Sequence, residues 1–162
     1  MKQVVLNHNN IFIRKFKEQD SKKVKDLIIT ILSKEFAIEK SAYPETDMEH
    51  INSSYGGKRD TFLVLVSEEK PIGTVAIKED SKFIALLRRF FVLPKFRKQG
   101  LGTLLLKEAI KFCREKGFHE VVFRTTDRMG SAIKLCKKNG FIEREKIPFE
   151  NFQIIKFVLT LK

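Results

Sequence analysis

The spacing of hydrophobic residues changes period along the chain and predicts its secondary structure. Residues 11–16 (IFIRKF) alternate in polarity like a strand. Asp20 and Ser21 then precede apolar residues at helical spacing in SKKVKDLIITILSKEF, so we expect these two residues to cap a helix. The segment SAYPETD breaks that helix, and MEHINSSY is expected to form a short second one before the Gly56-Gly57 turn.

The rest of the chain alternates between strand-like and helix-like patterns. Strands are expected in TFLVLVSEE, PIGTVAIKE and KFIALLRRFFV, with a turn around Glu69-Lys70-Pro71 between the first two. A glycine-containing junction leads into a helix that continues to about Lys116 and ends at Gly117. HEVVFRTT is a strand, GSAIKLCKKN a helix, and FIEREKI and NFQIIKFVLTL are the last two strands. The predicted order is β-α-α-β-β-β-α-β-α-β-β: an α/β fold with a mixed sheet, helices on both of its faces and one βαβ unit in its middle.

Length and composition favour one globular domain that spans residues 1–162. Hydrophobic residues make up 43% of the chain, which is too many for a disordered protein. The sequence has no apolar run long enough to cross a membrane, and its start lacks the pattern of a signal peptide. Cys113 and Cys136 suggest neither a disulfide scaffold nor a metal site, so we expect no metal and a reduced, cytoplasmic location.

Positive charge is concentrated in one part of the chain. The formal net charge is +12, and residues 82–116 contain ten Lys or Arg residues against only Glu108 and Glu115, a local net charge of +8. Such a concentration attracts nucleic acid or a small polyanion that carries phosphates. A basic, solvated surface without a specific ligand is the alternative.

The stretch RKQGLGT (97–103) lies at the centre of this basic region, where a strand passes directly into a helix. The first N–H groups of a helix have no intrahelical partners, and glycines let a ligand approach them closely. Arg97 and Lys98 add charged donors at the same place. The stretch is not a P-loop, since Thr103 follows Gly102, and it lacks the third glycine of the dinucleotide fingerprint, since residue 105 is Leu105. Its pattern favours anion binding, with a plain strand-to-helix turn as the alternative.

The segment RRFFVLPKFRKQGLGTLLLKEAIKFCREKGF resembles the acetyl-CoA-binding motif of the GNAT N-acetyltransferase superfamily. The motif (R/Q)xxGx(G/A) is met by Arg97, Gly100 and Gly102. Val92-Leu93-Pro94 resembles the V-x-P of that family, and SAIKLCKKNGF resembles its A-x-x-L-Y-x-x-x-G-F helix. The resemblance implies an acetyl-CoA-dependent N-acetyltransferase, GNAT-like with a central splayed sheet, that transfers acetyl directly to a primary amine of a small molecule or protein. We expect it to be a monomer or homodimer.

The resemblance also implies how acetyl-CoA is bound. Backbone amides from Lys98 to Thr103 would hold the pyrophosphate, with Arg97 supporting the loop. The strand edge at Phe91 to Leu93 would pair with the pantetheine arm as an added strand would, and the strand VVFRTT would splay away to leave a cleft. The expected binding residues are Phe91, Val92, Leu93, Arg97, Lys98, Gln99, Gly100, Leu101, Gly102 and Thr103.

The sequence departs from the family pattern where acid–base chemistry is usual. Leu86 stands where many relatives have a glutamate, and Cys136 stands where a tyrosine acid is usual. Cys136 is therefore a candidate catalytic residue that protonates the leaving thiolate, with core packing as the alternative. Glu35 and Glu150 are other candidate carboxylates, unless both are ordinary surface acids.

Two other functions remain open. Leu86 and Cys136 are also compatible with a non-catalytic CoA-binding module. The basic region is compatible with a nucleic-acid-binding protein, although the chain has no aromatic–basic RNA-binding signature and nucleic acid is not the expected partner. The pattern does not specify the acceptor amine. Phe149 and Phe152 are candidates for lining the acceptor site, with core packing as the alternative.

Overall fold

One eight-stranded sheet forms the centre of the molecule in this computed structural model, which describes residues 4–6, 10–44 and 46–162. The strands are β1 (Val4–Leu6), β2 (Ile11–Lys15), β3 (Thr61–Ser67), β4 (Lys70–Glu79), β5 (Ile84–Val92), β6 (Glu120–Thr126), β7 (Ile142–Phe149) and β8 (Phe152–Thr160). The helices are α1 (Ser21–Glu35), α2 (Ile51–Ser54), α3 (Leu101–Glu115) and α4 (Gly130–Lys138), with 3-10 turns η1 (Glu18–Asp20), η2 (Glu39–Ala42), η3 (Thr46–His50) and η4 (Pro94–Phe96). The strand order is β1-β2-β3-β4-β5-β6-β8-β7. Among the described strands, β5 and β6 are the one pair that runs parallel, and α3 connects them, which confirms the predicted βαβ unit.

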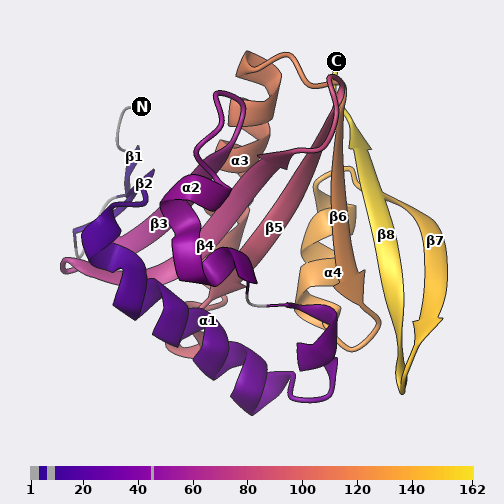
Figure 1. The fold of residues 1–162 in the computed structure, drawn as a ribbon, viewed down its shortest axis with the longest axis horizontal. Coiled ribbons are helices and arrows are strands. Elements are labelled where there is room, and N and C mark those ends of the chain that lie inside the picture. Colours follow the sequence, from indigo (N-terminus) through magenta and orange to yellow (C-terminus); the bar gives the residue numbers. More distant parts are fainter. Residues whose placement is uncertain (1–3, 7–9, 45) are drawn as a thin grey trace.

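Helices cover both faces of the sheet, with α1 and α2 on one side and α3 and α4 on the other (Figure 1). Strand β3 shows how the sequence produces this arrangement. Phe62, Val64 and Val66 belong to the apolar cluster that includes α1, whereas Leu63 and Leu65 belong to the cluster that includes α3. A strand buried on both faces is continuously apolar instead of alternating. None of the helices in the described ranges has the length and apolar character needed to span a membrane.

The structure differs from the prediction in two details near the first strand and the first helix. The three-residue strand β1 was not predicted, because three residues are too few to show a period; it pairs antiparallel with β2. Asp20 precedes α1 but its side chain does not cap that helix. Its carboxylate instead accepts the N–H of Lys17 (2.8 Å) and pairs with the Arg14 guanidinium (2.7 Å), which ties β2 to the start of α1.

Two further boundaries differ slightly from the prediction. The β3–β4 turn lies at Glu68 and Glu69, both with positive φ (49° and 66°), so Lys70 already belongs to β4. Positive φ at two successive residues matches the twist of a tight hairpin. The expected second helix is divided into the 3-10 turn η3 and the short α2.

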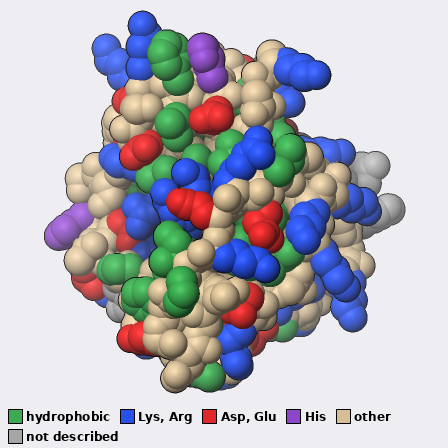
Figure 2. All heavy atoms as spheres, turned by 90° about the vertical axis from the view of Figure 1, so that its right-hand side faces the viewer, with side chains coloured by type: hydrophobic (Ala, Val, Ile, Leu, Met, Phe, Trp, Pro, Cys, Tyr) green, Lys and Arg blue, Asp and Glu red, His purple; other side chains and the backbone are tan. Residues whose placement is uncertain are grey.

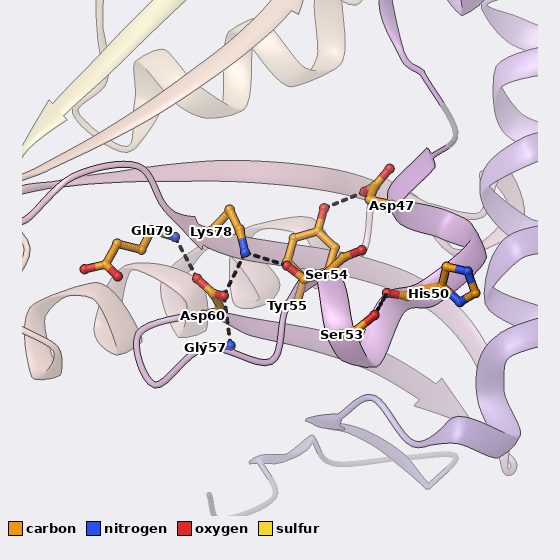
Figure 3. Close-up of polar contacts among 9 residues, drawn as sticks. All are labelled: Asp47, His50, Ser53, Ser54, Tyr55, Gly57, Asp60, Lys78 and Glu79. Carbon is orange, nitrogen blue, oxygen red and sulfur yellow. Dashed lines mark hydrogen bonds and ion pairs between the residues drawn. The ribbon is translucent and has the colours of Figure 1, made fainter.

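Asp60 fixes the connection from α2 to the sheet (Figure 3). Its carboxylate accepts the backbone N–H groups of Glu79 (2.8 Å) and Gly57 (3.0 Å) and pairs with the Lys78 ammonium group (3.0 Å). Lys78 also donates to the carbonyl of Ser54 (2.7 Å). Burial by itself would raise the pKa of Asp60, but these hydrogen bonds outweigh burial and hold the pKa below its usual value.

A bulge interrupts β5 in the middle of the sheet. Thr74 of β4 is paired with Phe91 and Ala76 with Arg88, so two residues of β5 lie opposite one residue of β4. Arg89 lies at the bulge with a φ of 51°, and its carbonyl accepts the Thr74 hydroxyl (2.6 Å). The inserted residue reverses the alternation of side chains along the second half of the strand.

Immediately before this bulge, β5 and β6 separate. Their paired residues end at Leu87 and Phe123, whereas β6 remains paired with β8 to Thr126. The splayed strands expected from the sequence are therefore confirmed. The edge of β5 beyond Leu87 faces away from β4, and its backbone groups are the ones a ligand can reach.

Candidate functional site

A cleft with a volume of about 410 Å³ lies at the N-termini of α3 and α4 and along the end of β5. It is lined by Glu35, Phe36, Phe90, Phe91, Val92, Arg97, Lys98, Gly100, Gly102, Thr103, Arg128, Met129, Gly130, Ser131, Ala132 and Leu135. Most residues expected to bind acetyl-CoA are among them. The exceptions are Leu93, Gln99 and Leu101; Leu101 is a core residue, and the N–H of Leu93 donates to the carbonyl of Ile72 (2.9 Å).

The glycines of RKQGLGT leave the backbone uncovered on this cleft. Gly100 precedes α3 with a φ of +80°, and a Cβ atom there would meet nothing within 4 Å. At Gly102 a Cβ atom would come within 3.3 Å of the Leu135 side chain. The first turn of the 15-residue α3 therefore presents free N–H groups and the positive end of its dipole to an open space. These features fit a phosphate group.

Arg97 fixes the loop that precedes α3. Its Nε donates to the carbonyl of Val92 at the end of β5 (2.8 Å). Its two Nη atoms donate to the two carboxylate oxygens of Glu35 at the end of α1 (2.5 and 2.9 Å). Glu35, considered above as a candidate carboxylate, is thus the ion-pair partner of Arg97, and the two residues link α1, β5 and the loop.

A smaller cleft of about 200 Å³ lies where β5 and β6 separate. It is lined by Ala42, Tyr43, Pro44, Leu86, Leu87, Arg88, Arg89, Phe90, Phe91, Val122, Phe123, Arg124, Met129 and Ala132. Phe90, Phe91, Met129 and Ala132 line both clefts, so the two spaces meet at these side chains. The arrangement offers two adjoining compartments, one suited to an anionic ligand of extended shape and one suited to a smaller molecule.

A buried ion pair forms one wall of the smaller cleft. Arg89 is 5% exposed, and its Nε donates to Asp47 (3.0 Å) while its Nη2 donates to the other oxygen of that carboxylate and to the carbonyl of Pro44. The hydroxyl of Tyr55 donates to Asp47 as well (2.6 Å; Figure 3). Burial alone would raise the pKa of Asp47, but the hydrogen bonds from Arg89 and Tyr55 outweigh burial and lower it. Asp47 is therefore a carboxylate that orients Arg89.

Comparison with known proteins decides the family. The profile of the acetyltransferase (GNAT) family matches residues 26–141. This chain belongs to the GNAT acetyltransferase family. Human N-acetyltransferase 8 is 34% identical to it over 59% of this chain and 45% of that protein, and streptothricin acetyltransferase A of Bacillus subtilis is 32% identical over 62% and 57%. The match thus spans about half the length of these curated relatives.

Solved structures have the same fold as this GNAT chain. A GNAT-family acetyltransferase of Staphylococcus aureus superimposes with a TM-score of 0.83 at 22% identity, covering 94% of this chain and 99% of that one. A putative acetyltransferase of Salmonella typhimurium, solved with its cofactor acetyl-CoA, superimposes with a TM-score of 0.76 at 18% identity and covers 94% of each chain. The GNAT fold expected from the sequence is confirmed.

The residues at which this GNAT chain departs from the family motif lie in different environments. Leu86 lines the smaller cleft. Cys136 is 0% exposed within the apolar cluster on the α3 side, and it lines neither the larger nor the smaller cleft. Burial raises the pKa of its thiol to about 12, so the thiol is neutral. This environment favours the packing interpretation of Cys136.

The other candidates near the acceptor side lie in or beside the β7–β8 turn. Glu150 accepts a hydrogen bond from the Ser41 hydroxyl (2.8 Å), which connects this turn to η2. Phe149 and Phe152 contact each other, with ring centroids 5.4 Å apart, and Phe152 is buried. Neither phenylalanine is among the described residues on the walls of the smaller cleft.

Sequence reasoning missed several residues of the site. Arg128 and the start of α4 line the larger cleft, and Arg88, Arg89 and Arg124 line the smaller one. One signal was available for two of them. Arg88-Arg89 is a pair of adjacent charges inside an otherwise apolar strand, which breaks the alternation that a regular strand requires.

Proposed function

We propose that this GNAT chain transfers the acetyl group of acetyl-CoA to a primary amine. The observation that carries the proposal is the meeting of the two clefts at Phe90, Phe91, Met129 and Ala132, beside the anion-binding junction at the start of α3. Such an arrangement would hold a donor and an acceptor side by side, which removes much of the entropic cost of bringing them together. The similarity to human N-acetyltransferase 8 and to streptothricin acetyltransferase A of Bacillus subtilis supports the same activity.

In this proposal the larger cleft holds acetyl-CoA, which supplies an acetyl thioester. The N–H groups from Lys98 to Thr103 would donate to the pyrophosphate, while Arg97 keeps the loop against β5 and α1 through its bonds to Val92 and Glu35. The free edge of β5 offers backbone donors and acceptors to the amides of the pantetheine arm.

In the smaller cleft, the surroundings of the amine would favour its uncharged, nucleophilic form. Apolar walls such as Leu86 and Phe91 disfavour a charged ammonium group by desolvation. The guanidinium groups of Arg88 and Arg124 on the same cleft disfavour it further by repulsion. The chain would therefore lower the pKa of the bound amine without a carboxylate at position 86.

The face that carries β7 and β8 does not form the continuous basic surface that nucleic acid would require. On the face that carries β7 and β8, basic side chains are interspersed with acidic and hydrophobic ones (Figure 2). Exposed Ile142 and Ile147 of β7 contribute to the apolar part of the surface. The cleft at the start of α3, where Gly100 leaves open space beside the first N–H groups of the helix, is the better candidate for phosphate recognition.

The proposal is tested by binding and by turnover. Calorimetry and thermal denaturation with CoA, acetyl-CoA and duplex DNA, each at low and moderate salt, should show binding of both coenzyme forms and none of DNA. Amine-dependent release of the CoA thiol, with acetylated product identified by mass, should follow. Coenzyme binding without transfer to any amine would identify a non-catalytic module, and strongly salt-dependent DNA binding without coenzyme binding would identify a nucleic-acid-binding protein.

A further inference from the structure

Arg89 has a donor without a partner on the wall of the smaller cleft. Its side chain is only 2% exposed, and Asp47 occupies Nε and Nη2, which form one edge of the guanidinium plane. The remaining nitrogen, Nη1, is buried and has no hydrogen-bond partner. Leaving a buried charged donor unpaired is unfavourable, so this edge of Arg89 is suited to an acceptor atom that enters the cleft.

The side chains around the smaller cleft carry an excess of positive charge. Arg88, Arg89 and Arg124 line it, and no Asp or Glu is among its described lining residues. Asp47 pairs with Arg89 and is 3.9 Å from Arg88, so two guanidinium groups share this one carboxylate. The arginines that line the cleft therefore carry more positive charge than Asp47 compensates.

The bulge of β5 is what brings two of these charges together. In a regular strand adjacent side chains point to opposite faces. Arg88 and Arg89 both approach Asp47, because the bulge places them on the same face of the sheet. The backbone conformation of β5 thus holds the two arginine side chains together, on the same strand that borders the larger cleft.

We infer that the acceptor is a small amine that also carries a carboxylate or similar anionic group and an apolar side chain. The anionic group would bind Arg89 Nη1 with Arg88 and Arg124, because guanidinium groups bind carboxylates through paired, charge-assisted hydrogen bonds. The apolar part would contact Leu86, Phe91 and Val122. The inference rests on the proposed acetyl transfer, and it excludes polyamines and other purely cationic amines as good acceptors.

Matched amines test the inference without any substitution in the protein. L-leucine and L-phenylalanine are compared with their amides, with phenethylamine and with spermidine, by thiol release at saturating acetyl-CoA. We expect kcat/KM for each amino acid to exceed that for its amide by at least tenfold, and no measurable rate with spermidine. Thermal denaturation with CoA present should show stabilisation by N-acetyl-L-phenylalanine and none by its amide, which is a readout independent of turnover.

Substitutions then assign the effect to the cleft. Arg124→Gln and Arg88→Gln should each raise KM for the amino acids at least fivefold more than KM for the amides, because only the amino acids carry the group that the guanidinium binds. The loss of repulsion toward the ammonium form affects both classes of amine alike. Arg144→Gln, which removes the same charge from exposed β7, is the matched control and should change neither. Arg89→Lys keeps the positive charge beside Asp47 but removes the Nη1 donor. It should raise KM for the amino acids more than the other substitutions do, and the CoA affinity of the variant is measured to check that the variant is folded.

The outcomes separate this inference from the proposed function. If acetyl-CoA does not bind, or no amine of any kind is acetylated, the proposed function fails and the inference with it. If amides, phenethylamine or spermidine are acetylated as fast as the amino acids, acetyl transfer stands and the inferred anionic acceptor is wrong. The same holds if acetyl-CoA binds and only amines without a carboxylate react. If the control Arg144→Gln raises KM as much as Arg124→Gln, the charge acts at long range and the cleft assignment is wrong.

Discussion

Gly100→Glu should abolish acetyl-CoA binding while the protein still folds. Gly100 has a φ of +80°, and a Cβ atom there would meet no atom within 4 Å. The new side chain would therefore not clash with the protein and would project into the cleft next to the free N–H groups of α3. The left-handed conformation costs a non-glycine residue about 1–2 kcal/mol, which corresponds to a decrease in Tm of roughly 2–8 °C for a chain of this size.

The expected loss of affinity follows from charge. A carboxylate held about 4 Å from one phosphate charge is repelled by roughly 4 kcal/mol at the effective dielectric constant of a protein surface. Since about 1.4 kcal/mol corresponds to a factor of ten, the Kd for acetyl-CoA should rise by about three orders of magnitude, and less at high salt. Calorimetry with CoA and acetyl-CoA measures the change directly.

Two controls separate the carboxylate from the backbone strain. Gly100→Ala introduces the same strain without the charge, so we expect the same decrease in Tm and at most a tenfold increase in Kd. Gly117 also has a φ of +80° and open space around its Cβ position, but it follows α3 at the opposite end. Gly117→Glu should therefore lower Tm similarly and leave Kd unchanged. A Kd for Gly100→Glu within threefold of the wild-type value would refute the assignment of the junction to phosphate binding.

Three further predictions concern side chains around the site. Arg97→Ala should weaken acetyl-CoA binding by about tenfold or less in calorimetry, since the backbone donors remain. Glu35→Gln should weaken binding less than Arg97→Ala does, and a larger loss would contradict the role of Glu35 as a support for Arg97. Cys136→Ser should leave kcat unchanged and lower the free energy of unfolding by about 1–3 kcal/mol, because it buries a hydroxyl in an apolar cluster; a tenfold decrease in kcat with unchanged acetyl-CoA affinity would instead place the thiol in the mechanism. Because the pKa of Asp60 is lower in the folded protein, its carboxylate stabilises the fold above the unfolded pKa of about 3.9, and this stability is lost as the pH falls through the folded pKa. Urea midpoints measured from about pH 6 to pH 2 should therefore decrease less in Asp60→Asn than in the wild type.

Local patterns in the sequence were sufficient to predict the helices and strands and the larger cleft, which is the part of the site proposed to bind acetyl-CoA. The helical spacing of α1 and α3, the strand runs and the RKQGLGT junction all report contacts between near neighbours in the chain, so the order of elements and most of the larger cleft could be predicted. The acceptor side could not. Arg89 meets Asp47, which lies 42 residues earlier in a 3-10 turn, and nothing in the local pattern around either residue predicts that contact. β1 was missed for a different reason, since three residues do not establish a period.

The bulge in β5 explains how one local conflict in the sequence produces both parts of the site. Ala85 and Leu87 point into the apolar cluster on the α3 side, and a regular strand would next place Arg89 there. A guanidinium in that cluster would be buried without an ionic partner, which is far more costly than one residue with positive φ. The bulge avoids this cost by turning Arg89 toward Asp47, and it places Phe90 in the α3-side cluster instead, where its ring contacts that of Phe123 (6.2 Å between centroids). The bulge directly follows the last residue pair between β5 and β6. It therefore lies where the edge of β5 beside the larger cleft becomes free of β6, and it also brings Arg88 and Arg89 to the wall of the smaller cleft.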